Sequence, residues 1–381
     1  MKKTRILASI LAAVMLFCTG CGVVQNQPAA APTEEPAKET TSTVDGATAT
    51  GDSQSQALAD ADIVLKLSHT DNDISMLSNT WNCYARTFKN QLEILSGGTM
   101  SVQIYPNSQL GDETSTLEQC SQGTVDIVVG ATCGNLASWV PNFNVFDIPY
   151  LMENLEACNL VCQSDIIREL NQELNEAGNM EVLSLMATAY RNLETWDKPV
   201  SEVSQVKGMK LRIQSIEAHT TMVKGWGAIP TTVAFSELYS AASTGVIDAF
   251  ENANYTLFFN NLYETVNYIT ETQHLANACM CVMSTKTLDK LTDEQQGWVK
   301  KAAMEARRAA LGVVAANNVN VMSQLQDLGI EVISLSEEQK TGFKDACYDA
   351  CVNAVLQSVD ADFYQRFLTA YEEAEAYLGI A

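Results

Sequence analysis

The chain has 381 residues, a length that suits two domains of roughly 150 residues each plus additional segments. Its 46 acidic and 23 basic residues give a formal net charge of −23, and it has no basic stripe to neutralise phosphates, which argues against a nucleic-acid partner. Apolar residues make up 46% of the chain, enough for a sizeable core, but no apolar run after residue 20 reaches the roughly 18 residues of a membrane span.

Residues 1–20 have the organisation of an export signal. A basic start is followed by an apolar run over residues 6–17, too short to cross a bilayer, and then by small residues just before Cys21. This pattern resembles a bacterial lipoprotein signal, which predicts cleavage before Cys21 and a lipid on its sulfur. Cys18 stands where such a signal usually has an aliphatic residue, so an ordinary secretory signal is the alternative. Both interpretations predict export.

Residues 21–61 are rich in Ala, Thr, Ser, Gln, Pro and Glu and have almost no aromatic or large aliphatic side chains. Such a segment cannot offset the entropy of ordering, so we expect a flexible tether. A lipid at Cys21 followed by this tether would hold a folded domain close to the membrane. The predicted location is the extracytoplasmic face of the cell membrane, at the cell surface or in the periplasm.

From residue 62 onward the pattern alternates between strand and helix. The first half predicts strands at 63–68, 101–105 and 126–130 with helices at 77–95 and 114–121. The second half predicts strands at 210–214, 230–233 and 330–334, short helices at 217–226 and 236–243, and two helices that begin at capping boxes after Thr292 and Ser336. The first of these runs past residue 320. Such strand–helix–strand units predict an α/β fold with a mainly parallel sheet flanked by helices.

Nine cysteines remain once the two in the leader are set aside. An odd number fits poorly with a complete disulfide framework, and no paired Cys-x-x-Cys zinc pattern occurs. We interpret these cysteines as buried small hydrophobes and predict neither a metal site nor a cofactor. His219 and His274 are expected to be structural and not catalytic.

Ten short segments of the folded part form an ordered set. They are YPNSQLGDE at 105–113, LEQ at 117–119, GTVD at 123–126, VP at 140–141, DIPY at 147–150, YRN at 190–192, KPV at 198–200, KGMKLRI at 207–213, GAIPTTVAFSELY at 227–239 and TGVIDAFEN at 244–252. Together they resemble the substrate-binding proteins of TRAP transporters, the DctP family. The resemblance spans roughly residues 62–375, essentially the whole folded part.

The resemblance implies two α/β lobes of periplasmic-binding-protein type, joined by a hinge and braced by a long helix. We expect lobe I to comprise residues 62–187 and 277–318, and lobe II to comprise residues 188–276 and 319–381. The resemblance also implies that the lobes close over a small organic acid, such as a dicarboxylate or a sugar acid. The ligand would then pass to the small and large membrane subunits of a TRAP transporter. Such a protein binds and delivers its ligand and is not an enzyme.

The resemblance also implies ligand contacts. Arg212 would pair with the ligand carboxylate, which a guanidinium can fork with two hydrogen bonds. Arg191, Asn252 and Phe235 would add further contacts. Each has a structural alternative: an edge-strand position for Arg212, an ion pair with an acid such as Glu194 for Arg191, a turn for Asn252 and plain core for Phe235.

Two further candidate groups follow predicted strands. Ligands in open α/β folds lie beyond strand ends, which favours His69, Thr70 and Asn72 after the first strand. Ser215 lies just after the strand that contains Arg212, in a similar place. All four are predicted to face the cleft.

Two positions that depart from the family pattern restrict the predicted ligand, and two other kinds of function are alternatives to a TRAP substrate-binding protein. Ala131 and Gly134 stand where relatives that bind sialic acid carry an acidic residue and an arginine, which argues against sialic acid as the ligand. An ABC-type binding lipoprotein, or a ligand-sensing subunit of a signalling system, would have the same lobes and stays an alternative. A secreted hydrolase is disfavoured because neither Gly-x-Ser-x-Gly nor His-Glu-x-x-His occurs.

Overall fold

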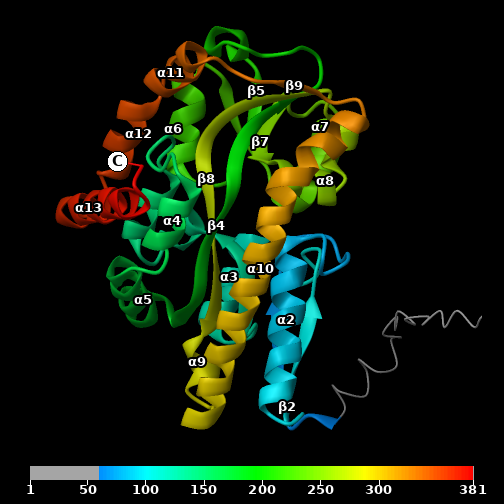
Figure 1. The fold of residues 1–381 in the computed structure, drawn as a ribbon, viewed down its shortest axis with the longest axis vertical. Coiled ribbons are helices and arrows are strands. Elements are labelled where there is room, and N and C mark those ends of the chain that lie inside the picture. Colours follow the sequence, from blue (N-terminus) through cyan, green and yellow to red (C-terminus); the bar gives the residue numbers. More distant parts are fainter. Residues whose placement is uncertain (1–59, 381) are drawn as a thin grey trace, which may run out of the picture. The chain divides into compact units, whose positions relative to one another are not determined.

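The computed structural model describes residues 60–380, so the predicted export signal, Cys21 and nearly all of the predicted tether lie outside the described residues. Within residues 60–380, nine strands form one sheet in the order β2-β1-β3-β8-β4-β7-β5-β6, and β9 pairs with β8 (Figure 1). The strands are β1 (Ile63–Ser68), β2 (Met100–Tyr105), β3 (Ile127–Thr132), β4 (Met180–Thr195), β5 (Lys210–Ile213), β6 (Ile229–Thr232), β7 (Ala249–Ala253), β8 (Tyr268–Ser284) and β9 (Glu331–Ile333).

Helices flank this sheet. The α-helices are α2 (Thr80–Leu95), α3 (Glu113–Gln122), α4 (Leu155–Val161), α5 (Asp165–Gly178), α6 (Glu217–Gly225), α7 (Leu238–Ser243), α8 (Asn254–Phe259), α9 (Thr285–Leu288), α10 (Asp293–Asp327), α11 (Glu337–Asp345), α12 (Tyr348–Val355) and α13 (Ala361–Leu378). Short 3₁₀ helices are η1 (Cys133–Leu136), η2 (Pro141–Asp147), η3 (Val203–Val206), η4 (Phe235–Glu237) and η5 (Leu262–Thr265). None of the helices in this described part combines the length and hydropathy of a membrane span.

Two groups of parallel strands lie at the two ends of the sheet. β1 pairs in parallel with β2 and β3, and β5 pairs in parallel with β6 and β7. The long strands β4 and β8, of 16 and 17 residues, lie between the groups and run antiparallel to each other. β8 is also antiparallel to β3, and β4 to β7. Most strand pairs are parallel, as predicted, but the longest pairing, which joins the two groups, is antiparallel.

Side chains alternate between two cores along β8, as the pleat of a strand requires. Ala278, Met280 and Val282 pack on one face, in a cluster with α3, α4, α5 and α13. Cys279, Cys281 and Met283 pack on the other face, against α2 and the first half of α10. Both faces of the central sheet are therefore covered by helices, and β8 reads as a continuous apolar run because both of its faces are buried.

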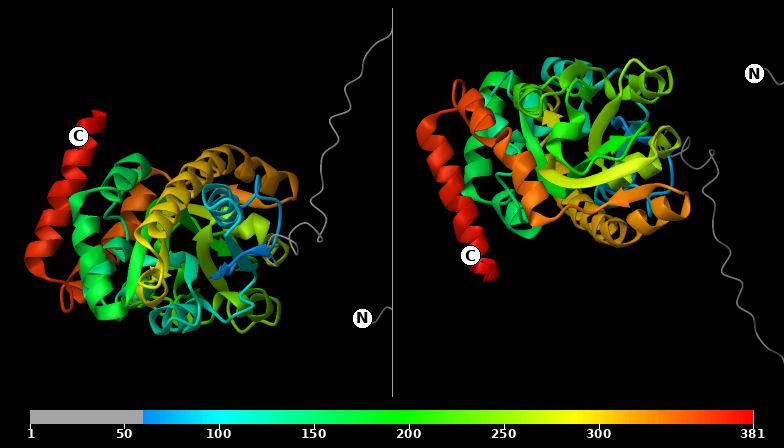
Figure 2. Two further views of the ribbon diagram at one scale, coloured as in Figure 1. Left: turned by 90° about the horizontal axis from the view of Figure 1, so that it is seen from below. Right: turned by 90° about the horizontal axis from the view of Figure 1, so that it is seen from above.

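The long helix α10 contacts both ends of the sheet. Its 35 residues begin at the predicted capping box, in which Thr292 and Gln295 each accept a backbone hydrogen bond of the other residue. The first half packs beside α2 in the cluster of β1, β2 and β3. Val321 and Leu325, in the second half, pack with α7, α8 and β7. The predicted helix that braces both parts of the fold is confirmed (Figures 1 and 2).

The C-terminal helices pack on a different part of the sheet. α12 lies against α6, and α13 lies against α4 and α5, visible as the red helix beside the green ones in Figure 2. The elements α4 and α5 fall within residues 62–187, which we predicted to belong to lobe I, whereas α13 falls within the range predicted for lobe II. The lobe boundaries stay a prediction.

Most predicted elements match those of the structure to within a few residues. The helix predicted from residue 77 instead begins at Thr80, because the Asn79 side chain accepts hydrogen bonds from the backbone N–H groups of Trp81 and Asn82 and so caps it. Leu77 is left outside the helix and is exposed. The helix predicted at 236–243 divides into η4 and α7.

Candidate functional site

Strand ends from both groups meet beside the middle of β4 and β8, where they enclose two adjoining cavities. The larger, of about 130 Å³, is lined by residues that follow β1, β5 and β6 and by the start of α3. The smaller, of about 50 Å³, reaches the middle of β4 and the end of β7. Thr70, Glu113, Gln214 and Phe235 line both. This position beyond the carboxyl ends of parallel strands is the usual ligand position in open α/β sheets.

Arg212 lines the larger cavity and has no carboxylate partner among the described residues. Its neighbours in β5, Leu211 and Ile213, are buried in an apolar cluster, and the Arg212 side chain is itself only 2% exposed. Its Nε donates a hydrogen bond of 2.9 Å to the carbonyl oxygen of Val233. Burial lowers the pKa of Arg212 to about 10, opposed by the charge of Glu251. A buried cation that lacks a carboxylate partner and lies beside a cavity attracts an anion strongly.

Arg191, which lines the smaller cavity, is paired within the protein. Its Nη2 donates to Glu251 Oε1 at 2.8 Å, and its Nε donates to Oε2 of the same carboxylate. Its Nη1 donates to Asn277 Oδ1 at 3.2 Å and faces Asn252 Oδ1 at 3.4 Å. The alternative of a structural ion pair is therefore realised with Glu251, on the neighbouring strand β7, and not with Glu194.

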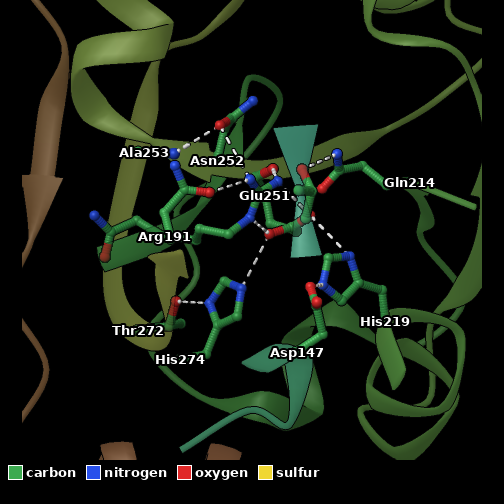
Figure 3. Close-up of polar contacts among 12 residues, drawn as sticks. Asp147, Arg191, Gln214, His219, Glu251, Asn252, Ala253, Thr272 and His274 are labelled. Atoms are coloured by element: carbon green, nitrogen blue, oxygen red, sulfur yellow. Dashed lines mark hydrogen bonds and ion pairs between the residues drawn. The ribbon is translucent and has the colours of Figure 1, made fainter. Parts of the chain in front are cut away.

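The ion pair continues into a buried polar cluster (Figure 3). His274 Nε2 lies 3.1 Å from Glu251 Oε2, and its Nδ1 lies 2.8 Å from Thr272 Oγ1. Burial opposes ionisation of Glu251, but Arg191 and the hydrogen bond from His274 outweigh it and hold its pKa well below the usual range. On the other side of the carboxylate, His219 Nε2 lies 3.0 Å from Asp147 Oδ1. Both imidazole rings are buried and line neither cavity.

The other predicted ligand contacts divide into two sets. Asn252 lines the smaller cavity, and its Oδ1 accepts a hydrogen bond of 2.8 Å from the backbone N–H of Ala253. Phe235 and Thr70 line both cavities, and Ser215 lines the larger one. These four residues line cavities that Arg212 and Arg191 also line.

His69 and Asn72 line neither of the two cavities. His69 is buried, its ring nitrogens have no hydrogen-bond partner within residues 60–380, and burial lowers its pKa to about 4. The backbone N–H of Asn72 donates to Asn260 Oδ1 at 3.0 Å, and Asn260 Nδ2 donates to Asp71 Oδ1 at 3.2 Å. Asn72 thus belongs to a contact between the loop after β1 and the end of α8.

Glu113 and Gln214 are cavity residues that the sequence prediction missed. Glu113 is the first residue of α3, and its Oε1 accepts hydrogen bonds from the backbone N–H of Thr132 and from Asn135 Nδ2 at 2.7 Å. Burial raises the pKa of Glu113 to about 7, although these hydrogen bonds oppose the rise. Gln214 Nε2 donates to Thr132 Oγ1 at 2.9 Å. Glu113 ends the YPNSQLGDE segment, which was the available signal.

All nine cysteines of the described part are buried, and none of them is in a disulfide bond. This burial agrees with their prediction as small hydrophobes. Within residues 60–380, no three or more His, Cys, Asp or Glu side chains are grouped so that they could hold a metal ion.

Residues 73–355 match the DctP family, described as bacterial extracellular solute-binding protein, family 7. The match covers well over half of the chain. The protein belongs to the DctP family. It is therefore a solute-binding protein of the TRAP type, as the ordered motifs predicted.

Individual relatives of this DctP-family protein are also solute-binding proteins. A solute-binding protein of Roseobacter denitrificans is 27% identical over 298 residues, which cover 78% of this chain and 89% of that protein. The C4-dicarboxylate-binding periplasmic protein DctP of Rhodobacter capsulatus is 27% identical over 271 residues, covering 68% of this chain and 78% of that protein.

Solved structures confirm the two-lobed α/β fold. A TRAP periplasmic solute-binding protein of R. denitrificans with bound L-galactonate has a TM-score of 0.74 at 25% identity, covering 82% of this chain and 99% of that one. The sugar acid binding protein DctPAm of Advenella mimigardefordensis, in complex with galactonate, has a TM-score of 0.77 at 22% identity, covering 82% of this chain and 98% of that one.

Proposed function

We propose that this protein captures a small organic acid in the two adjoining cavities and delivers it to the small and large membrane subunits of a TRAP transporter. The observation that supports this proposal most is Arg212, a buried guanidinium that lines the larger cavity and has no carboxylate partner among the described residues. A ligand carboxylate would supply the missing counter-charge and could accept two parallel hydrogen bonds.

The relatives support the same ligand class. The R. denitrificans structure holds L-galactonate, and the R. capsulatus protein is named for binding C4-dicarboxylates. L-galactonate and the C4-dicarboxylates are small organic acids, and a carboxylate is the group that they share. Because Arg191 is neutralised by Glu251, we assign the first ligand carboxylate to Arg212.

Capture by closure is supported by contacts across the cavities. Gln214, at the end of β5, donates to Thr132, at the end of β3, and Asn260 joins the end of α8 to the loop after β1. These hydrogen bonds connect the two groups of parallel strands directly. A ligand that contacts both groups would favour the arrangement in which they form. Small-angle scattering should show a smaller radius of gyration once ligand binds.

Membrane attachment through Cys21 is the second half of the proposal. A diacyl or triacyl anchor binds a membrane firmly, whereas one chain is marginal. Mass spectrometry of the native N-terminus is expected to find a lipid-modified Cys21. An unmodified terminus at another residue would overturn this assignment and leave the ligand site unaffected.

Calorimetric titration of organic acids into the purified domain tests ligand capture. Truncation of Arg212 to Ala should weaken binding by about 2–5 kcal/mol, because one member of a buried charge pair is lost. This corresponds to roughly 30- to several-thousand-fold in affinity. Lys at this position should restore binding only in part, because it offers a point charge and no planar fork.

Arg308→Ala is the matched control, since Arg308 is exposed on α10 and pairs with Glu305, one turn away. It should bind like wild type. An affinity of the Arg212→Ala protein within about threefold of wild type would contradict the assignment of the carboxylate to Arg212.

A further inference from the structure

Glu113 places a carboxyl group in the same cavity as the unpaired guanidinium of Arg212. One oxygen of this carboxyl, Oε1, is occupied by the backbone N–H of Thr132 and by Asn135 Nδ2. These two donors come from the end of β3 and from η1, and they hold the carboxyl in one orientation. Neither of these two hydrogen bonds uses the other oxygen, Oε2. Oε2 is therefore the oxygen that could accept a hydrogen bond from a ligand.

Two more polar atoms of this cavity lack partners. Gln214 Oε1 and Ser108 Oγ are buried without a hydrogen bond within residues 60–380, and both residues line the larger cavity. The amide nitrogen of Gln214 is already bound to Thr132, which leaves its carbonyl oxygen as an acceptor. Buried acceptors without partners are costly, and a ligand that brings hydroxyl donors would satisfy them.

The charge balance of the cavities limits the ligand to few negative groups. The cationic side chains that line them in the described structure are Arg212 and Arg191, and Arg191 is compensated by Glu251. The acidic residues that line them are Asp71, Asp112 and Glu113. A dicarboxylate would bring a second negative charge into a site with one unpaired cation, and it would meet Glu113 without a counter-charge.

We propose that Glu113 is a specificity-determining residue that accepts a hydrogen bond from a ligand hydroxyl, so that the site selects hydroxylated monocarboxylates over dicarboxylates. This inference rests on the proposed function, because it needs the ligand carboxylate at Arg212. Arg212 binds the single carboxylate, and Glu113, Gln214 and Ser108 bind hydroxyl groups farther along the ligand. Specificity of this kind is large when a missing ligand hydroxyl leaves a buried acceptor unpaired.

Matched acids of equal chain length provide the test. D-erythronate, succinate and butyrate have four carbons and differ in carrying hydroxyls, a second carboxylate or neither. Galactonate, adipate and hexanoate form the corresponding six-carbon set. In calorimetric titrations of the wild-type protein, the hydroxylated acid of at least one set should bind at least tenfold more tightly than its two partners. Tightest binding of a dicarboxylate would overturn the inference.

Glu113→Gln sharpens this test. The variant keeps Oε1 as an acceptor for Thr132 and Asn135, but it replaces the acceptor Oε2 by an amide donor and removes the charge. Affinity for the hydroxylated acid should fall about ten- to a hundredfold, as expected for one hydrogen bond to a charged group. Affinity for the dicarboxylate should stay the same or rise. Equal affinities of variant and wild type for the hydroxylated acid would overturn the role of Glu113.

Glu118→Gln is the matched control, since Glu118 is exposed on the same helix, α3. It should leave every affinity unchanged. Arg212→Ala separates the two proposals. If the dicarboxylate binds best and its binding depends on Arg212, the specificity inference fails while ligand capture stands. If no acid binds in an Arg212-dependent way, the proposed function itself fails.

Discussion

Two buried arginines lie on neighbouring parts of the sheet and are held in opposite ways. Arg191, on β4, contacts both oxygens of Glu251 and two asparagine side chains, and is 4% exposed. Arg212, on β5, is 2% exposed and makes one hydrogen bond, to a backbone carbonyl. Both line cavities, but only the second has an unsatisfied charge.

This difference separates a structural charge from a charge available to a ligand. A buried cation with a bidentate carboxylate partner is already stabilised and gains little from a second anion. A buried cation without such a partner destabilises the ligand-free protein and is stabilised when an anion arrives. Burial and residue type, which are nearly the same for Arg191 and Arg212, do not distinguish the two; the partners do.

The largest effect is expected at Arg191. Arg191→Met leaves the Glu251 carboxylate buried without its main partner, and breaking such a pair typically costs about 3–5 kcal/mol. Urea unfolding of the ligand-free protein measures this loss. In the double variant Arg191→Met/Glu251→Leu, which removes both charges, most of it should be regained. A loss under about 1 kcal/mol in the single variant would show that the ion pair is not the structural element described here.

The ion pair of Arg191 and Glu251 also makes a contribution to the free energy of unfolding that depends on pH. Arg191 lowers the pKa of Glu251 in the folded protein below the ordinary value of 4.5. The resulting stabilisation is therefore present above about pH 4.5 and is lost as the pH falls toward the folded-state value. The difference in unfolding free energy between wild type and Arg191→Met should shrink in acid.

In the ligand-free protein, the charge of Arg212 should lower the free energy of unfolding, whereas the charge of Arg191 raises it. Burial lowers its pKa from the ordinary arginine value to about 10, and each tenfold change in acidity corresponds to about 1.4 kcal/mol. The charge is therefore unfavourable below pH 10, and Arg212→Met should raise the unfolding free energy by on the order of 1–3 kcal/mol at pH 7 while binding is lost. Thermal unfolding without ligand measures this. A destabilised variant would mean that Arg212 is structural, like Arg191.

A smaller effect is expected at the contact between the loop after β1 and the end of α8. Asn260→Ala removes the hydrogen bonds to Asn72 N and Asp71 Oδ1. At roughly 0.5–1.5 kcal/mol for each of the two hydrogen bonds, ligand affinity should fall about 5- to 150-fold if the contact forms on closure. Asn353→Ala, on the exposed face of α12, is the control. Unchanged affinity of Asn260→Ala would place this contact outside the closing motion.

The last effect is expected at Glu194, a third ionisable residue in this part of the sheet. Glu194 is fully buried, and neither of its carboxyl oxygens has a hydrogen-bond partner within the described residues. Burial and the nearby Glu251 raise its pKa well above the ordinary value of 4.5, although Arg191 opposes the rise. Because the folded state holds the proton longer than the unfolded state, wild-type stability falls as the pH rises above about 4.5. Glu194→Gln should therefore stabilise the protein more at pH 8 than at pH 5.

The sequence was sufficient to predict strands and helices that have one buried face and one exposed face, because their apolar residues then recur with a regular period. β1 and α10 are examples, because their apolar residues recur at the spacing of a strand and a helix. β4 and β8 were largely missed because both of their faces are buried and bulges interrupt their register, so neither alternates regularly.

The candidate site was predictable in part. Arg212 could be found because an arginine between Leu211 and Ile213 in an apolar strand matches a family motif. The partner of Arg191 could not, because Glu194 is nearer in sequence while the pairing of β4 with β7 brings Glu251 alongside. The position of Glu113 in the cavity depends on how α3, β3 and η1 pack together, which no local pattern encodes.

The burial of every cysteine in the described part also offers a way to time the opening of the protein. Burial raises the pKa of thiols such as Cys120 and Cys281, so the native protein presents neither access nor thiolate to an alkylating reagent. A thiol can be modified only after the part of the fold that buries it opens, and the rate of modification then reports the population of open molecules. Because eight of these nine cysteines lie in three different apolar clusters, peptide mapping of the label would show which part of the fold opens first.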